Sequence, residues 1–184
     1  MPSSACSGKQ PPASVIRSFA PLLGTKARML ILGSMPGQAS LRANCYYAHP
    51  HNAFWLILGE TLGFDPMQPY EQRCRHLTDA GIAVWDVLQQ CIRPGSLDTD
   101  IAPESIVPND FDGLFARQPS IRWVLFNGAA AETCFRRHVL PGLENRPEFM
   151  LLRLPSTSPA HAALRPAQKL AVWREAIRSA LAAV

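Results

Sequence analysis

The sequence predicts an α/β fold with three layers, in which a central four-stranded parallel sheet lies between helices. The first observation behind this prediction is that short apolar runs alternate along the chain with longer amphipathic segments, the pattern of parallel strands joined by helices. The second is that 47% of the 184 residues are hydrophobic, which is enough to bury both faces of such a sheet. We expect one domain over residues 15–184, after a flexible tail at residues 1–14 that is rich in Ser and Pro.

Four apolar runs have the length of strands. Residues 27–32 stop at Gly33, and their lack of polar alternation indicates a strand that is buried on both faces. The other expected strands are residues 82–85, 121–126 and 149–152.

Five amphipathic segments are expected to be helices. They are residues 52–62, 70–80, 110–117, 129–138 and 165–181. Asn52 and Asp110 are suitable N-cap residues, and Gly63 and Gly81 are suitable helix ends. The polar, proline-bearing connection at residues 89–109 is expected to lack regular structure, and connections of that length in a small domain are usually functional or mobile.

The composition argues against several classes of protein. No apolar run approaches the roughly 20 residues that cross a bilayer, and residues 1–14 lack the basic and apolar regions of a secretory signal. The five cysteines contain no Cys-x-x-Cys pair, which argues against zinc and iron–sulfur sites. We therefore expect a cytoplasmic protein with buried free thiols, no metal and no cofactor. The net charge of +4 is compatible with a nucleic-acid partner.

In a parallel sheet of this kind, ligands bind beyond the carboxyl ends of the strands. The segments expected at that edge are residues 33–37, Asp86, residues 127–128 and residues 154–159. The turn Gly33-Ser34-Met35-Pro36-Gly37 has open backbone amides that can bind a phosphate, a base edge or a water, although a plain strand-exit turn also fits it. It matches neither a Walker A loop nor a dinucleotide-binding fingerprint.

Aromatic and amide side chains follow this turn at Tyr46, Tyr47 and Asn52. We expect one tyrosine to stack on an extruded base and the other to pack in the core with its hydroxyl bonded. Asn52 is an expected N-cap whose side chain can also face a ligand. His49 and His51 are interpreted either as phosphate contacts or as structural or solvated histidines.

The run from Leu32 to Trp55 contains Gly-Ser-Met-Pro-Gly and then Tyr-Tyr-Ala-His-Pro-x-Asn-x-Phe-Trp, and Leu-Pro-Ser-Thr-Ser-Pro-Ala follows at residues 154–160. Val-Trp-Asp-Val-Leu and Phe-Asn-Gly stand between them, at residues 84–88 and 126–128. These four ordered motifs resemble the uracil-DNA glycosylase superfamily. Within it, the likeness is closest to the sixth family, the hypoxanthine-DNA (deoxyinosine) glycosylases. The resemblance covers the chain from about Arg28 to the last helix.

The resemblance implies a uracil-DNA glycosylase-like fold and hydrolysis of the base–sugar bond of a deaminated base that is flipped out of DNA, without a metal. Asn52 resembles the family's catalytic asparagine, and an amide oxygen can hold water against a sugar of oxocarbenium character. Residues 33–37 would line the base pocket. Because no lysine stands in these motifs to form a Schiff base, we expect a monofunctional enzyme that leaves an abasic site.

Hypoxanthine offers an N1–H donor and an O6 acceptor to such a pocket. An ionised Asp86 could accept from N1–H, which adenine lacks, and a backbone amide of the first turn or the Asn127 amide could donate to O6. A carboxylate beside a base that gains negative charge as it leaves is repulsive, and Asp86 is interpreted equally well as a turn or cap carboxylate. Uracil-specific relatives place a polar residue and a histidine where this chain has Met35 and Leu154, which favours hypoxanthine over uracil.

Contacts to DNA are expected around this pocket. The residues expected to bind DNA are His49, Ser156, Thr157, Ser158, His161 and Arg165. The loop after Leu154 resembles the segment that presses into the minor groove, and Leu164 or Arg165 is expected to wedge into the base stack. We expect damaged DNA as the partner, no membrane association and a monomer. The competing hypotheses are a mismatch-type uracil or thymine glycosylase and a non-catalytic nucleic-acid-binding module of the same fold.

Overall fold

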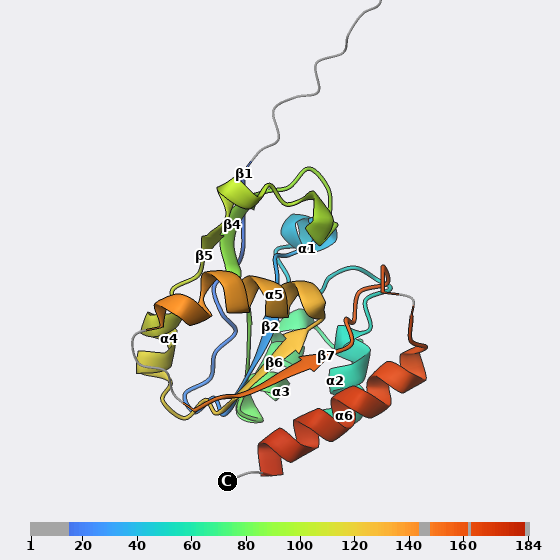
Figure 1. The fold of residues 1–184 in the computed structure, drawn as a ribbon. Coiled ribbons are helices and arrows are strands. Elements are labelled where there is room, and N and C mark those ends of the chain that lie inside the picture. The colour runs from blue at the N-terminus through green and yellow to red at the C-terminus, as the bar shows by residue number, and fades with distance from the viewer. Residues whose placement is uncertain (1–14, 144–147, 162, 183–184) are drawn as a thin grey trace, which may run out of the picture.

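The computed structural model describes residues 15–143, 148–161 and 163–182, and its centre is a four-stranded parallel sheet (Figure 1). The strands are β2 (Met29–Gly33), β3 (Ile82–Asp86), β6 (Trp123–Asn127) and β7 (Met150–Leu154). Their order is β3-β2-β6-β7, with Gly33 opposite Asp86 and Leu32 opposite Phe126. The predicted sheet is confirmed, with small shifts of the strand bounds. The expected tail at residues 1–14 lies outside the described residues.

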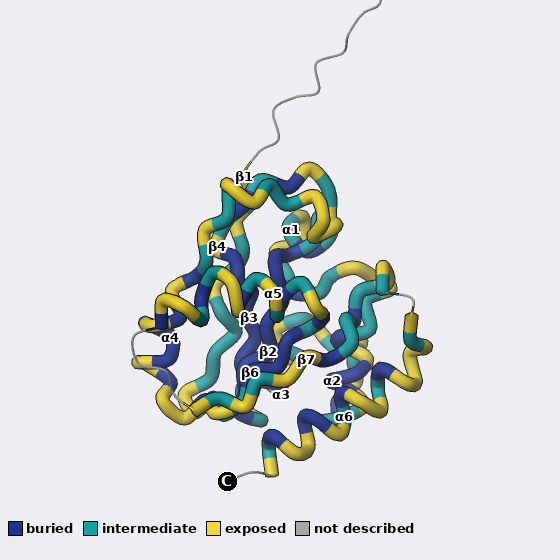
Figure 2. Tube along the Cα trace, viewed as in Figure 1, coloured by how far each residue is buried: buried dark blue, intermediate teal, exposed yellow. Residues whose placement is uncertain are grey.

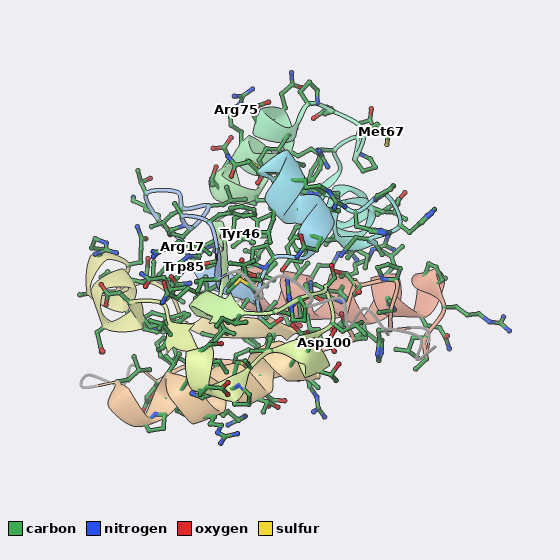
Figure 3. The ribbon with its side chains drawn as sticks, turned by 90° about the horizontal axis from the view of Figure 1, so that it is seen from above. Arg17, Tyr46, Met67, Arg75, Trp85 and Asp100 are labelled. Carbon is green, nitrogen blue, oxygen red and sulfur yellow. The ribbon has the colours of Figure 1, made fainter. Side chains whose placement is uncertain are left out.

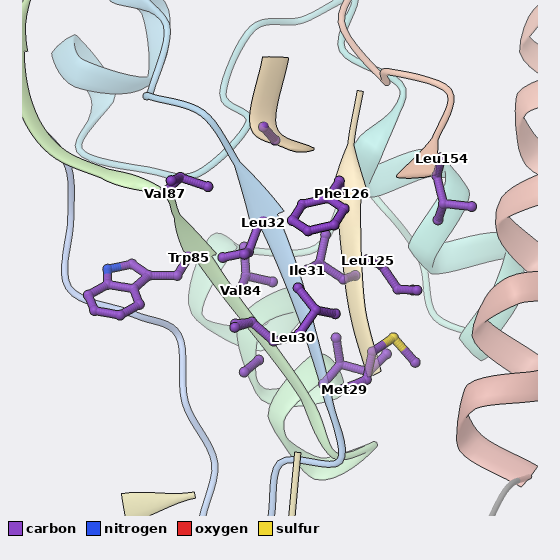
Figure 4. Packing of buried hydrophobic residues seen from close by; sticks show 14 of the residues in the cluster. Met29, Leu30, Ile31, Leu32, Val84, Trp85, Val87, Leu125, Phe126 and Leu154 are labelled. Atoms are coloured by element: carbon purple, nitrogen blue, oxygen red, sulfur yellow. The ribbon is translucent and has the colours of Figure 1, made fainter. Parts of the chain in front are cut away.

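The two strands β2 and β3 are buried along their whole length, as Figure 2 shows. Leu30, Ile31 and Val84 have no exposed surface, and Figure 4 shows how such side chains fill the space beside the strands. Because successive side chains of a strand point to opposite faces, an unbroken apolar strand requires that both faces be covered.

Helices cover both faces of the parallel sheet. On one face lies α5 (Ala129–His138), where the rings of Phe135 and Phe126 have centroids 5.3 Å apart. On the other face lie α2 (Phe54–Leu62) and α3 (Tyr70–Asp79), and α6 (Pro166–Ala182) packs against α2 through Phe54 and Trp173. Figure 1 shows α5 in front of the sheet and α3 behind it. The other helices are α1 (Gln38–Ala43) and α4 (Phe111–Arg117).

The two predicted N-caps have different outcomes. Asp110 caps α4, and its side chain accepts a hydrogen bond from the Gly113 N–H at 2.9 Å. The N-cap prediction for Asn52 is wrong, because Ala53 occupies that position of α2. The Asn52 Oδ1 instead accepts from the Phe54 backbone N–H at 3.0 Å, an Asx-turn that leads the chain into the helix.

The prediction that residues 89–109 lack regular structure is also wrong. This segment contains most of β4 (Leu88–Ile92), two 3-10 turns, η1 (Asp98–Asp100) and η2 (Pro103–Ser105), and β5 (Val107–Pro108). β4 pairs antiparallel with β5 and with β1 (Val15–Arg17), and the three strands form a second sheet of order β1-β4-β5. Because the pairing joins Val15 to Ile92, the local sequence does not reveal it. A third 3-10 turn, η3 (Leu140–Gly142), follows α5.

The cysteines of the described residues are free, and they are less buried than expected. Cys91 is buried, whereas Cys45, Cys74 and Cys134 are partly exposed because they lie on or beside helices at the rim of the core. Within the described ranges, no helix is both long and apolar enough to cross a membrane.

Gly128, between β6 and α5, adopts a backbone conformation that other residues reach only with strain. Its φ is +98°, and a Cβ at this position would lie 2.9 Å from the Ser156 Cβ. We expect Gly128→Ala to lower the free energy of unfolding by about 1–3 kcal/mol in urea denaturation. The matched control is Gly142→Ala, because a Cβ there meets no atom within 4 Å. Equal losses of stability in the two variants would contradict this account.

Candidate active site

A cavity of about 320 Å³ opens at the carboxyl ends of the parallel strands. The strand order reverses between β2 and β6, and crevices at such reversals are where open α/β sheets bind ligands. Every residue predicted to act in catalysis or to bind the base lines this cavity, namely Gly33, Ser34, Met35, Pro36, Gly37, Tyr46, Tyr47, Asn52, Asp86 and Asn127. Figure 3 looks onto this end of the molecule, with Tyr46 and Trp85 labelled.

The turn after β2 is held in place by a buried arginine. The guanidinium of Arg93 donates to the carbonyls of Met35 and Pro36, and its Nε donates to Gly95 O at 3.0 Å. Arg93 is only 2% exposed. Because a buried cation needs compensating partners, these carbonyls both stabilise the guanidinium and are fixed by it.

The segment after β4 forms the wall of the cavity next to this turn. Asp98 accepts a hydrogen bond from Ser34 Oγ at 2.6 Å and lies 3.6 Å from Arg93 Nη1. Ser96 Oγ accepts from the Gln38 backbone N–H at 3.0 Å, at the start of α1. Arg93, Ser96 and Asp98 were not predicted from the sequence, since contacts distant in sequence bring them to the turn. The only local signal was the polar run, with Gly95 in it, that follows β4.

The two tyrosines both line the cavity but differ in burial and partners. Tyr46 is buried, and its hydroxyl donates to Ala20 O at 3.2 Å. Tyr47 has a positive φ of 54°, and its ring stacks on Phe54 with a centroid distance of 3.8 Å. Burial, and the nearby Asp86 carboxylate, raise the pKa of Tyr47 well above its ordinary value. A neutral phenol is thus fixed in the cavity at a strained backbone position, and such strain concentrates at functional sites.

Asn52 lines the same cavity as Met35 and Asp86. Its Oδ1 is fixed by the hydrogen bond from the Phe54 N–H. A carbonyl oxygen has two acceptor sites, so this bond orients the amide and leaves a second site for another donor.

Asp86 ends β3 and lies against β2. It is 3% exposed, and its Oδ2 is buried without a hydrogen-bond partner among the described residues. A Cβ built on Gly33 would lie 2.5 Å from Asp86 Oδ1, so only glycine leaves room for this carboxyl. Burial raises the pKa of Asp86 to about 8, Arg93 opposes this rise, and Asp98 adds to it. Burial therefore favours the neutral carboxyl in the unliganded cavity, whereas the contact from N1–H considered from the sequence assumes the ionised form.

Asn127 is the last residue of β6, and its side chain both accepts from and donates to the loop after β7. Its Oδ1 accepts from the Thr157 backbone N–H at 2.8 Å, and its Nδ2 donates to Thr157 Oγ1 at 2.9 Å. Thr157 O accepts from the Ala53 N–H at 3.0 Å. Asn127 thus positions this loop beside Asn52, and its side chain also interacts with the Tyr47 hydroxyl.

The last helix fixes the same loop through two buried side chains. Trp173 Nε1 donates to Pro155 O at 2.9 Å. Lys169 is 5% exposed, and its Nζ donates to His161 O at 2.7 Å and to Ser158 O at 3.3 Å. Burial lowers the pKa of Lys169. No local motif in the sequence marks Lys169 or Trp173 as part of the site.

The residues predicted to bind DNA are only partly brought together. His49, Ser156, Thr157 and Ser158 line the cavity. His161 instead borders a neighbouring hollow with Arg153 and Leu154, and Arg165 is exposed just before α6. His51 is exposed and Leu164 is half-buried. In the part of the chain that the structure describes, no three His, Cys, Asp or Glu side chains are grouped so that they could hold a metal ion.

Comparison with known proteins identifies the family. Residues 20–179 match the Uracil DNA glycosylase superfamily, a range that includes every residue lining the cavity. The chain belongs to this superfamily.

Two relatives from Methanosarcina are named hypoxanthine DNA glycosylase. The M. barkeri (strain Fusaro) protein is 40% identical over 113 residues, which are 61% of this chain and 70% of that protein. The M. acetivorans protein is 38% identical over 116 residues, or 62% and 72% of the two chains. The solution NMR structure of an M. acetivorans uracil DNA glycosylase candidate superposes with a TM-score of 0.74 and 31% identity, covering 91% of this chain and 99% of that one.

The buried carboxyl gives this superfamily member a specific dependence of stability on pH. In the unfolded chain Asp86 releases its proton near its ordinary pKa of 3.8, whereas in the folded protein it does so at about 8. Between these values folding takes up a proton, so raising the pH lowers the free energy of unfolding, by at most about 1.4 kcal/mol per pH unit. We expect Asp86→Asn to remove this decline, so that its stability relative to wild type increases from about pH 5 to pH 8 in urea titrations.

The matched control is Asp79→Asn, at the exposed end of α3. This variant should follow the wild-type dependence of stability on pH. A constant stability difference between Asp86→Asn and wild type across the range would contradict a raised pKa at Asp86.

Proposed function

We propose that this protein is a DNA glycosylase that hydrolyses the N-glycosidic bond of hypoxanthine flipped out of DNA and leaves an abasic site. The observation that carries the proposal is one cavity, in a member of the uracil DNA glycosylase superfamily, that contains Asn52, Tyr47 and Asp86 together. The names of the two Methanosarcina relatives support hypoxanthine as the base. We further propose that residues 15–184 form one catalytic domain that acts as a monomer in the cytoplasm.

The cavity suits a single base that has left the helix. Its volume of about 320 Å³ lies at the low end of small-molecule pockets, which span roughly 300–1,000 Å³. An atom inside a duplex cannot reach such a cavity, so the target nucleotide must be extruded. Tyr47, braced by Phe54, supplies an aromatic ring for stacking, and its rigid placement reduces the entropy lost on binding.

Asn52 is proposed to hold the attacking water. The Phe54 N–H orients the Asn52 amide, and the free acceptor site of Oδ1 can accept a hydrogen bond from water. Loss of the base gives the sugar oxocarbenium character, so the water needs correct placement more than a strong base.

The polar groups around the base must match hypoxanthine. A neutral Asp86 carboxyl has one donor and one acceptor, which fit O6 and N1–H of the lactam edge. The backbone N–H groups of Met35 and Gly37 and the Asn127 amide are proposed as further donors in the same cavity. Leu154 is buried at the end of β7 and lies outside the lining of this cavity. It therefore offers no polar group to a departing uracil.

We propose that the loop after β7, which Asn127, Lys169 and Trp173 hold in place, contacts the phosphate backbone of the DNA. Ser156, Thr157 and Ser158 line the cavity, but Thr157 is 1% exposed and its hydroxyl accepts from Asn127. We therefore propose that Ser156 and Ser158, rather than Thr157, contact a phosphate next to the extruded nucleotide. His49 stands at the same rim. His161 and Arg165 lie farther out and would meet flanking phosphates.

The proposed activity is tested with oligonucleotides that carry inosine, uracil, xanthine or ethenoadenine. Strand cleavage by alkali after incubation reports abasic sites, and we expect the fastest formation with inosine. Release of uracil without release of hypoxanthine would instead support the mismatch-type uracil or thymine glycosylase. Binding of DNA without any abasic product would support a non-catalytic module.

Asn52→Ala is expected to lower the single-turnover rate on inosine DNA by at least about 100-fold, because the water loses its position. The dissociation constant for the same DNA should change by only a few-fold. Gln72→Ala, which removes an exposed amide from α3, is the control and should retain the full rate. A rate for Asn52→Ala within a few-fold of wild type would contradict the role of Asn52.

Lys169→Met is expected to weaken DNA binding by about tenfold, because the loop must then be ordered when DNA binds. The rate at saturating enzyme should change less than the affinity does, as measured by titrating single-turnover reactions. Lys26→Met, at an exposed position, is the matched control. Unchanged affinity in Lys169→Met would show that the loop does not depend on this bond.

A further inference from the structure

The buried Oδ2 of Asp86, in the lining of the cavity, lacks a hydrogen-bond partner among the described residues. The carboxyl lies against Gly33, where a Cβ would be 2.5 Å from Asp86 Oδ1. The neighbouring Tyr47 hydroxyl interacts with the Asn127 side chain instead. Because a buried polar atom without a partner is unfavourable, the unpaired Asp86 oxygen indicates that a ligand supplies the missing bond.

We propose that Asp86 is a catalytic acid, which donates its proton to the departing purine as the N-glycosidic bond breaks. This inference rests on the proposed glycosylase function and goes beyond it by giving Asp86 a chemical role in addition to its proposed contacts with the base. The position of Asp86 at the end of β3, in the lining of the cavity and opposite Gly33, places the carboxyl where the base must enter.

The surroundings of Asp86 keep its carboxyl protonated. Arg93 lowers the pKa of Asp86, but its guanidinium donates to the carbonyls of Met35, Pro36 and Gly95, and its Nη1 lies 3.6 Å from Asp98. Asp98 adds a like charge that disfavours a second carboxylate. On the side of α2, Tyr46 and Tyr47 face Asp86 as neutral phenols, since burial raises the pKa of each.

A neutral acid also removes a difficulty that a carboxylate would create. When the bond between C1′ and N9 breaks, its electron pair stays with the base, whose ring nitrogens and O6 become more negative. A carboxylate beside that charge would repel it, whereas an O–H stabilises it and can pass on its proton.

The proposed step is balanced in atoms and charge. The proton moves from the Asp86 carboxyl to an acceptor of the purine, which leaves as neutral hypoxanthine. The oxygen of the water held by Asn52 bonds to C1′. The proton that this water releases returns to Asp86, directly or through solvent, so the acid is restored for the next turnover.

The test is the dependence of the single-turnover rate on pH, from about pH 6 to pH 10. The proteins compared are wild type, Asp86→Asn and the surface control Asp79→Asn, on DNA that carries inosine. We expect wild type and Asp79→Asn to lose rate above pH 8, approaching tenfold per pH unit. Asp86→Asn should be slower by at least about 100-fold at neutral pH and should lack this loss, since an amide cannot transfer the proton.

Binding is measured in parallel with DNA that carries a 2′-fluoro-substituted deoxyinosine, which resists cleavage. We expect Asp86→Asn to bind it within a few-fold of wild type, because the amide keeps the size of the carboxyl. A defect that appears entirely in this affinity would make Asp86 a recognition residue and overturn the proposal.

Two further outcomes are distinguishable from each other. An alkaline loss of rate that persists in Asp86→Asn belongs to another group, such as N1–H of the substrate, and overturns the role of Asp86 alone. Absence of abasic product with wild type at every pH overturns the proposed glycosylase function itself.

Discussion

Gly33 and Asp86 face each other at the carboxyl ends of β2 and β3, with no room for a side chain on residue 33. This close approach removes the Asp86 carboxyl from water while leaving it in the lining of the cavity. Burial without a paired cation disfavours the carboxylate, and the pKa rises to about 8 as a result. The polarity of the base pocket, the proposed chemistry and the dependence of stability on pH all follow from this one contact between strands.

The walls of the cavity are fixed by buried cations that bind carbonyls. Arg93 holds the turn after β2 from the side of the antiparallel sheet, and Lys169 holds the loop after β7 from α6. Because these two cations are bonded mainly to main-chain oxygens, their charge stabilises loop geometry and does not pair with Asp86. The turn is thereby attached to the antiparallel sheet, in which β4 pairs with β1, and the loop after β7 is attached to α6.

The sequence predicted those features that local patterns encode. The unbroken apolar runs of β2 and β3 and the Asp110 cap of α4 are local signals. The rule that ligands bind at strand ends brought together Met35, Asp86 and Asn127, which line one cavity, whereas Asn52 was found through the family motif. Features set by contacts distant in sequence were missed: the pairing of β1 with β4, and the bonds of Arg93 and Lys169 to loop carbonyls. The protonation state of Asp86 was also inaccessible, since it depends on burial that no spacing of residues reveals.

The central claim is that an uncharged carboxyl stands in the base pocket at neutral pH. It is tested most directly by following the ¹³Cγ chemical shift of Asp86 by NMR in the unliganded protein as the pH is raised, with Asp86→Asn used to assign the signal. This account predicts a titration midpoint of about 8. A midpoint near the ordinary value of 3.8 would contradict it, because the carboxyl would then be ionised when the base arrives.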